Sequence, residues 1–258
     1  MEQVLAQIRK INQIFQKSDA NSFSYGKICE ILGDIMKSNF YIVLADGVVL
    51  GDYYTHREDS SAVYDPATGT SKFRKEENQV LLEIEETWAN FPPEAVKRIF
   101  ESAKGKPNKF HMFIPVYGGG KRLGTLVIAR YEAQYEISDI ILGEHVSTVV
   151  GVEIERRKNS EQKELEQESV AARIALEALS FTELIAVKEI LKEINGREGV
   201  VVGSKIADQA HITRSIVVNS LKKLESSGVI ESRSLGAKGT KIRINNEHLI
   251  SELIKVKL

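Results

Sequence analysis

The stretch that most constrains the fold is residues 203–240, where a short helix, a break, a second helix and a Gly-rich hairpin follow one another. Residues 204–209 predict the first helix. Thr213 is a good N-cap for the second helix, because its hydroxyl can accept a backbone N–H of the first turn. The second helix carries apolar residues at i, i+4 and i+7, which places them on one face: Val217, Leu221 and Leu224.

The rest of this stretch predicts a two-stranded wing. Gly228 stands where a helix C-terminus favours a left-handed residue. Val229 begins a strand, and residues 235–240 supply a Gly-rich, basic turn before a second strand at 241–244. Helix, turn, helix and wing together are the pattern of a winged helix-turn-helix, with its helix-turn-helix at about 203–226.

The polar faces of this pattern suit duplex DNA. A helix fits the major groove, where Arg214 can pair with guanine, Asn219 with adenine and the Val218 methyls with a thymine methyl. Lys222 and Lys223 on the helix and two wing lysines are placed to neutralise phosphates. A solvated amphipathic helix in an ordinary α+β domain is the alternative. The predicted DNA-binding residues are Ser204, Lys205, Thr213, Arg214, Ser215, Val218, Asn219, Lys222, Lys238 and Lys241.

The distribution of charge along the chain agrees with nucleic-acid binding by the C-terminal part only. The 258-residue chain has a net charge of −1, yet from residue 200 onward ten Lys and Arg face five Asp and Glu. The single cysteine, Cys29, excludes an internal disulfide framework and fits a reducing cytosol. No apolar run approaches the roughly 20 residues that span a bilayer, and residues 1–15 form an amphipathic pattern rather than a signal peptide. We therefore expect a cytoplasmic protein without a membrane partner.

The N-terminal half alternates helical and strand patterns. Helices are predicted at 2–17 and 24–37, and Asp46-Gly47 predicts a two-residue hairpin turn with positive φ at both positions. The polar residues 55–75 predict a long loop, and residues 76–89 predict a helix.

Pro93 can start a further helix, which is predicted to run to about residue 103. Strands are then predicted at 109–117 and 123–131, around the turn Gly118 to Arg122. This turn lacks the strand–loop–helix context and the GK[ST] ending of a phosphate loop. Helices followed by a mixed sheet of about five short strands indicate a GAF- or PAS-like sensory domain over residues 1–136, with a small-molecule pocket on one face.

A long helix is predicted at 137–179, with apolar ends and a charged middle, as a connector between domains requires. Its apolar flanks could also form a dimer seam. Ser180 to Glu183 is a capping box that starts a new domain at 180–258. Four apolar residues at helical spacing predict a C-terminal helix that packs on this domain: Leu249, Ile250, Leu253 and Ile254.

No catalytic pattern stands out. The five histidines include no pair at metal-ligand spacing, and His111 and His145 read as core or interface residues. Nucleophile elbows, Walker motifs and paired-carboxylate signatures are missing from the sequence. Trp88 is expected to fill the core or to roof the pocket. The sequence therefore predicts neither an enzyme nor a metal site.

The segments SKIAD, ITRS, LKKLESSGVIESRSLG and AKGT, within residues 204–240, closely resemble the DNA-binding end of the CodY family, nutrient-responsive repressors of Gram-positive bacteria. LSFTEL, VVGVEI and GGGKRLGTL extend the resemblance toward the N-terminus. It implies an α+β fold with an N-terminal GAF-like sensor domain, a long connector helix and a C-terminal winged helix-turn-helix domain. It also implies a global transcriptional regulator, mainly a repressor, whose effector is a branched-chain amino acid, with GTP as a second signal in many members.

The same resemblance carries over several effector-site residues. It places Phe91, Pro92 and Pro93 at the pocket edge, with Arg57 or Arg74 near the effector carboxylate. Where the family has a Ser-Arg-Arg-Gly-Lys hairpin, this chain has residues 44–48, LADGV, although Glu153 and Lys158 match the family's nucleotide site. Because the cationic residues are lost, GTP is predicted to bind weakly or not at all. A different small ligand, or none, stays open.

Three hypotheses follow. The first is an effector-responsive homodimer that binds double-stranded DNA, in which the effector shifts the population of connector-helix arrangements. The second is a constitutive DNA-binding protein whose GAF-like domain serves only dimerisation. The third is a sensory enzyme or a ligand-binding signalling protein.

Overall fold

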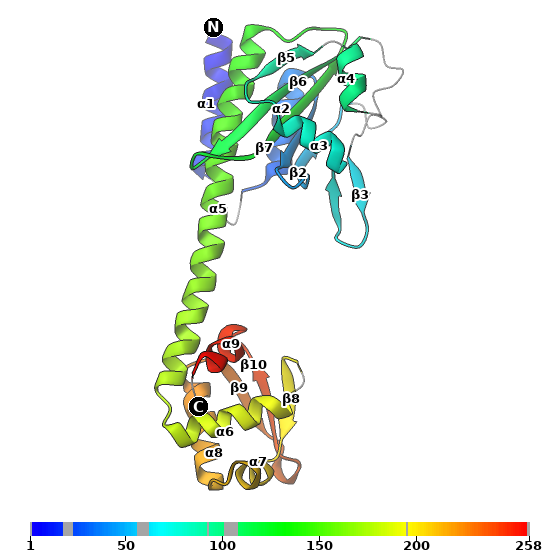
Figure 1. The fold of residues 1–258 in the computed structure, drawn as a ribbon. Coiled ribbons are helices and arrows are strands. Elements are labelled where there is room, and N and C mark those ends of the chain that lie inside the picture. Colours follow the sequence, from blue (N-terminus) through cyan, green and yellow to red (C-terminus); the bar gives the residue numbers. More distant parts are fainter. Residues whose placement is uncertain are drawn as a thin grey trace. The chain divides into compact units, whose positions relative to one another are not determined.

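The computed structural model describes residues 2–17, 23–55, 62–91, 93–100, 108–194 and 196–256. The chain divides into two compact units, residues 1–159 (unit 1) and residues 160–258 (unit 2). The division lies inside one helix, α5 (Ile137–Glu177), which contributes residues to both units (Figure 1). The long helix predicted at 137–179 is thus present and ends at Glu177.

Unit 1 is built on a five-stranded sheet of order β2-β1-β7-β6-β5. The strands are β1 (Asn39–Leu44), β2 (Val49–Tyr53), β5 (Trp88–Phe91), β6 (Lys109–Gly118) and β7 (Lys121–Tyr131). Every neighbouring pair is antiparallel, so the expected mixed sheet is wrong. The physical reason is that short hairpins join β1 to β2 and β6 to β7, and hairpins pair strands in opposite directions.

Each face of this sheet carries its own core. On one face, α1 (Glu2–Lys17), α2 (Tyr25–Met36) and the first part of α5 pack on Met112, Ile114 and Val116 of β6. On the other face, α3 (Lys75–Leu82) and α4 (Pro93–Ile99) pack on an aromatic layer that includes Tyr41 and Phe113. The two faces follow from the alternation of side chains along each strand.

Between β2 and β5 the structure differs from the sequence-based expectation. The predicted loop 55–75 contains a small hairpin of β3 (Val63–Asp65) and β4 (Thr70–Lys72), whose turn is held by the Asp65 carboxylate. The predicted helix 76–89 ends at Leu82, because Trp88 and Phe91 pair with β6 as an edge strand. Trp88 is 45% exposed and stacks on Phe91, so it does not fill the core.

The two glycine turns of the sheet also differ from each other. At the predicted two-residue turn only Gly47 has positive φ, and the Asp46 carboxylate accepts the backbone N–H of Val48 (3.1 Å) in a longer connection. In the β6–β7 turn Gly119 and Gly120 both have positive φ, 52° and 74°. The β6–β7 hairpin lies directly on α5, since a β-carbon at Gly119 would come 2.1 Å from Glu155 Oε1.

Unit 2 contains the end of α5, α6 (Phe181–Glu193), β8 (Glu198–Val201), α7 (Gly203–Ala210), α8 (Arg214–Ser226), β9 (Ile230–Ser234), a short 3₁₀ helix (Gly236–Lys238), β10 (Thr240–Ile244) and α9 (His248–Lys255). The capping box at Ser180 is confirmed. The wing has a third strand, because β8 pairs with β10 on the side opposite β9.

The core of unit 2 is one apolar cluster drawn from all of its α-helices and strands. Leu249 and Leu253 of α9 are buried in it, as predicted, but Ile250 and Ile254 are 43% and 78% exposed. The four residues span two sides of a single helix, and only one side meets the unit. In the described part of the chain, no helix is long and apolar enough to cross a membrane.

Candidate nucleic-acid interface

The helix-turn-helix is formed by α7 and α8. α7 ends at Ala210, and His211, with φ of 54°, turns the chain toward α8. α8 buries four residues against the unit: Val217, Ser220, Leu221 and Leu224. The stripe predicted from the sequence is therefore confirmed. It leaves the opposite side of α8 exposed, with the residues predicted to meet DNA: Arg214, Ser215, Val218, Asn219 and Lys222.

Thr213 occupies the N-cap position of α8, with φ of −85° and ψ of 150°, but its hydroxyl caps no backbone N–H. Its Oγ1 lies instead 2.8 Å from the Oγ of Ser215. The predicted capping hydrogen bond is wrong because the two hydroxyls bond to each other. Both hydroxyls are exposed at the helix start, where such groups can rotate to donate to phosphate oxygens.

Three of the predicted basic residues have acidic partners. Lys205 pairs with Glu193 (2.9 Å) and Lys241 pairs with Glu198 (3.1 Å). The Lys223 ammonium donates to Glu183 (2.7 Å) and to the carbonyl oxygen of Ala178 (3.3 Å).

Glu183 is the carboxylate of the capping box and is largely buried. The Lys223 hydrogen bond, followed by that from the Ser180 backbone N–H, lowers the pKa of this carboxyl. Lys223 therefore joins α8 to the start of α6, and the phosphate contact predicted for it stays a prediction.

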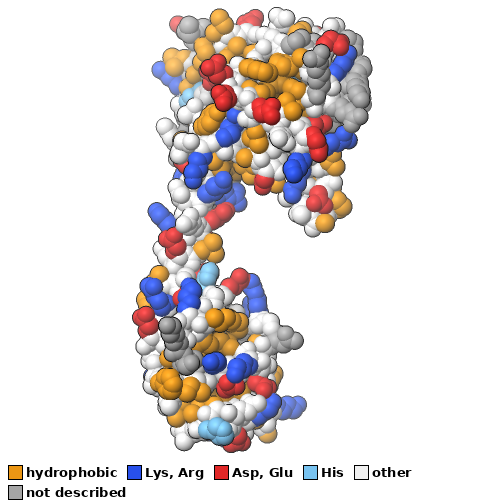
Figure 2. All heavy atoms as spheres, viewed as in Figure 1, with side chains coloured by type: hydrophobic (Ala, Val, Ile, Leu, Met, Phe, Trp, Pro, Cys, Tyr) orange, Lys and Arg blue, Asp and Glu red, His pale blue; other side chains and the backbone are white. Residues whose placement is uncertain are grey.

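Other cations on the same surface have no such partner. Among the described residues, Arg214, Lys222 and Lys238 form no ion pair, and all three are exposed. Ser204 is exposed on α7 beside Lys205. Sequence reasoning missed Arg233 and Arg243 of the wing strands, which only strand register could have placed on one exposed face. On the face drawn in Figure 2, basic side chains of unit 2 lie among acidic ones and form no continuous patch.

The predicted effector edge lies beside the aromatic layer of unit 1. Phe91 is half-buried at the end of β5, directly opposite His111 on β6, and its ring centroid is 5.8 Å from that of Phe113. Pro93 begins α4. Pro92 and Arg57 lie outside the described residues.

His111 is the polar member of this layer. Its ring lies 6.2 Å from that of Phe100 and 5.9 Å from that of Phe113, centroid to centroid, and its Nδ1 has no hydrogen-bond partner among the residues described. Burial, followed by the nearby Lys109 charge, lowers the pKa of His111 to about 3. The imidazole is therefore neutral at physiological pH, and it is buried with one ring nitrogen that no described residue contacts by a hydrogen bond.

The two residues that match the family's nucleotide site, Glu153 and Lys158, do not lie on the same side of α5. Glu153 is buried on α5 with Arg156 at 3.6 Å, whereas Lys158 is exposed. Five residues of an α-helix rotate the side chain by about 140°, so the two point to different sides. The Asp46 carboxylate is engaged with its own turn, at Val48.

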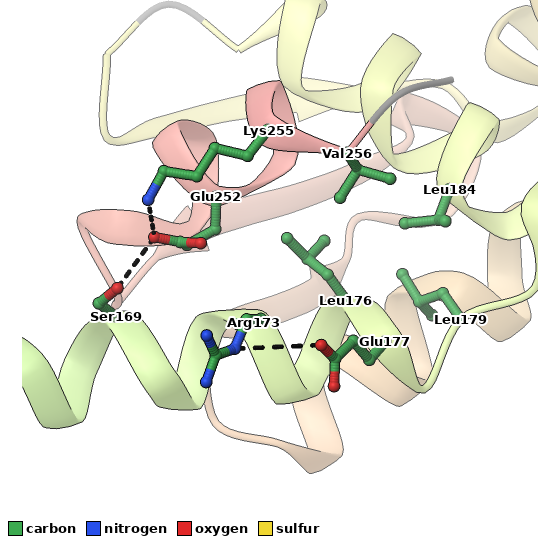
Figure 3. Close-up of a pocket in the computed structure, with 9 residues that line it drawn as sticks. All are labelled: Ser169, Arg173, Leu176, Glu177, Leu179, Leu184, Glu252, Lys255 and Val256. Atoms are coloured by element: carbon green, nitrogen blue, oxygen red, sulfur yellow. Dashed lines mark hydrogen bonds and ion pairs between the residues drawn. The ribbon is translucent and has the colours of Figure 1, made fainter.

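A pocket of 480 Å³ lies in unit 2 between α5, α6 and α9 (Figure 3). Leu176, Leu179 and Leu184 supply its apolar side. Its charged groups bond to one another, since Glu252 accepts from Lys255 (2.6 Å) and Ser169 (2.9 Å). The Ser169 bond joins α9 to α5 within the unit. No cluster of residues suited to a metal ion occurs in the described ranges.

Comparison with known proteins gives concordant results. A family model described as the CodY GAF-like domain matches residues 3–178, and one described as the CodY helix-turn-helix domain matches residues 197–257. The chain is 40% identical over 260 residues to the global transcriptional regulator CodY of Clostridium perfringens, with 100% of both chains covered. It is 40% identical over 258 residues to that of Clostridium beijerinckii, also with 100% of both chains covered.

Among similar solved structures is that of the cofactor binding GAF domain of the nutrient sensor CodY from Clostridium difficile. It is 39% identical, with a TM-score of 0.50, over 59% of this chain and 97% of that chain.

Proposed function

Since the chain belongs to the CodY family of global transcriptional regulators, a family without enzymatic activity, we propose that it binds operator DNA through α8 and the wing and acts mainly as a repressor. The supporting observation is the division of α8 into two sides. Val217, Leu221 and Leu224 hold the helix on unit 2, while Arg214 and Asn219 remain exposed for base edges.

We propose Ser204, Thr213, Ser215, Val218, Lys222 and Lys238 as further DNA contacts. Lys205 and Lys241 belong to the same surface, but each must break its ion pair with a glutamate before it can contact a phosphate. This requirement makes their contribution smaller than that of an unpaired lysine, because a carboxylate competes for the same ammonium.

Unit 1 is proposed to bind a small effector at its aromatic layer, and a branched-chain amino acid is the proposed effector. The similar Clostridium difficile domain is described as cofactor-binding and as part of a nutrient sensor. In this chain the half-buried Phe91 offers apolar surface for an aliphatic side chain, backed by the buried ring of Phe113, and the neutral His111 in the same layer carries an Nδ1 without a partner among the described residues. Phe91, Pro92, Pro93 and Arg57 are the proposed pocket residues.

GTP is not proposed as an effector. Residues 44–48 provide an acid where phosphates would need cations, and Glu153 and Lys158 point to different sides of α5. A phosphate group beside Asp46 would meet repulsion rather than the charge-assisted bonds that hold phosphates in proteins.

The proposed organisation has three parts: an effector domain at 1–136, a connector helix at 137–179 and a DNA-binding domain at 180–258. The active species is proposed to be a cytoplasmic homodimer, because two recognition helices must match two half-sites. The effector can act only through its different affinities for the arrangements that do and do not match.

The test combines calorimetry with DNA binding. Isothermal titration of the full chain with isoleucine, valine, leucine and GTP identifies the effector, and fluorescence anisotropy measures its effect on affinity for a duplex selected from a random pool. We expect heat and tighter DNA binding with one of the amino acids, and none with GTP. DNA binding that no ligand alters would support the constitutive alternative, and no DNA binding would refute the function.

A further inference from the structure

The outward face of the wing sheet carries an ordered charge pattern. On β10, Arg243 lies between Glu198 of β8 and Glu231 of β9 in the strand register. Two residues nearer the wing turn, Lys241 lies directly opposite Arg233 of β9. These side chains line a single open hollow of 400 Å³. Arg243 therefore has two acidic neighbours across the strands, whereas Arg233 lies opposite a lysine.

The two cations nearest the turn are not equivalent. Like charges directly opposite each other on neighbouring strands destabilise a sheet. Glu198 relieves this for Lys241, whose ammonium lies 3.1 Å from the carboxylate. Arg233 is exposed and forms no ion pair or hydrogen bond within the described ranges of the chain. A guanidinium in this situation can bind a phosphate through two parallel N–H bonds.

Two short contacts place this pair near the start of α8, one with backbone and one with a side chain. A β-carbon at Gly239, in the wing, would come 2.5 Å from the carbonyl oxygen of Val201. Two residues further along the chain, a β-carbon at Gly203 would lie 4.0 Å from Cγ of Arg214. The wing turn and the α7–α8 corner thus lie at the same end of unit 2 (Figure 1).

From this arrangement we infer that Arg233 binds a backbone phosphate of the DNA that α8 contacts, and that Glu198 competes with the same DNA for Lys241. The inference rests on the proposed DNA-binding function and adds two residues to it. Arg233 supplies a phosphate contact that sequence reasoning did not identify. Because Glu198 forms an ion pair with Lys241, this lysine is only partly available to a phosphate. The affinity for DNA is therefore lower than the number of basic residues in the wing indicates.

The test is the salt dependence of DNA binding by the full chain. Affinity for a 30-base-pair duplex from a random pool is measured by fluorescence anisotropy between about 50 and 200 mM KCl, a range over which lost phosphate contacts are resolved. Arg233→Gln should reduce the slope of log K against log salt by about 1 and weaken all sequences alike. Arg243→Gln is the matched control on the same face and should leave the slope unchanged.

Glu198→Gln should have the opposite effect, with tighter binding and a slope steeper by about 1, because Lys241 is released to a phosphate. Circular dichroism confirms that each variant is folded. Equal losses in Arg233→Gln and Arg243→Gln, or an unchanged slope in Arg233→Gln, would overturn the Arg233 contact. Unchanged binding by Glu198→Gln would overturn the competition. If the wild-type chain itself shows no salt-dependent binding, the proposed function fails, and this inference fails with it.

Discussion

Replacing Gly151 by Ala tests how the first part of α5 packs on the sheet of unit 1. Gly151 faces β6, and a β-carbon there would lie 2.1 Å from the carbonyl oxygen of Tyr117 and 3.1 Å from its carbonyl carbon. Both atoms belong to a strand that is paired with β7, at Arg122. The new methyl group therefore cannot be accommodated by a rotating side chain, and the helix and the hairpin must separate.

Two effects of opposite sign set the magnitude. Alanine is favoured over glycine inside a helix by about 1 kcal/mol. Overpacking against a rigid partner costs about 1–3 kcal/mol, and a backbone contact so far inside van der Waals distance belongs at the upper end. We therefore expect Gly151→Ala to lower the free energy of unfolding of unit 1 by about 2 kcal/mol.

The assay is urea unfolding of the full chain, followed by the fluorescence of Trp88, the single tryptophan, which lies in unit 1. Gly26→Ala is the matched control, because Gly26 is also helical and its β-carbon would meet only Ser24 Oγ, at 3.9 Å. The control should be neutral or stabilising by up to about 1 kcal/mol. A Gly151→Ala midpoint at or above that of the wild type would refute the reasoning.

The remaining predictions concern DNA affinity and pH. Arg214→Ala should weaken binding and relax sequence preference by about 1–3 kcal/mol, whereas Lys222→Ala should weaken selected and scrambled duplexes equally in anisotropy assays. Glu183→Gln keeps an amide oxygen that can accept a hydrogen bond but removes the carboxylate charge that Lys223 and the Ser180 N–H contact, which should destabilise unit 2 by about 1 kcal/mol at pH 7. Because the folded pKa of Glu183 is lowered from 4.5, this difference should shrink as the pH falls below 4.5, measured by circular dichroism in urea. His111 has a folded pKa of about 3 against 6.5 for the free group, so only the unfolded chain takes up the proton between these values. Stability of unit 1 should therefore fall by up to about 1.4 kcal/mol per pH unit below 6.5, and His111→Phe should flatten that dependence.

The helix-turn-helix could be predicted from sequence because its signals are local. The spacing of Val217, Leu221 and Leu224 and the position of Thr213 all lie within 12 residues, so helix periodicity alone locates them. The same local reasoning failed at Trp88 to Phe91, which is an edge strand only because β6 pairs with it from about twenty residues further along the chain.

The electrostatic state of each cation could not be predicted for a related reason. Lys223 and Lys222 are neighbours in sequence, yet only Lys223 meets Glu183, which is 40 residues away. Lys241 meets Glu198 across two strands whose register the sequence did not reveal. Counting basic residues indicates a DNA-binding surface, whereas tertiary contacts decide which of them are available.

The charged middle of α5 has a consequence for how this protein loses its structure. Every residue from 161 to 168 is exposed, so none of them adds a buried side chain that would support the helical hydrogen bonds there. Only propagation from the packed helical segments on either side holds these eight residues in the helix, and propagation gains little free energy per residue. This segment should exchange its amide protons early in hydrogen exchange. The unfolding of unit 1 and the unfolding of unit 2 should therefore be only weakly coupled through it. Calorimetry of the whole chain should then show two unfolding transitions, one for each unit, each with its own enthalpy. A single midpoint temperature would not describe the unfolding of either unit.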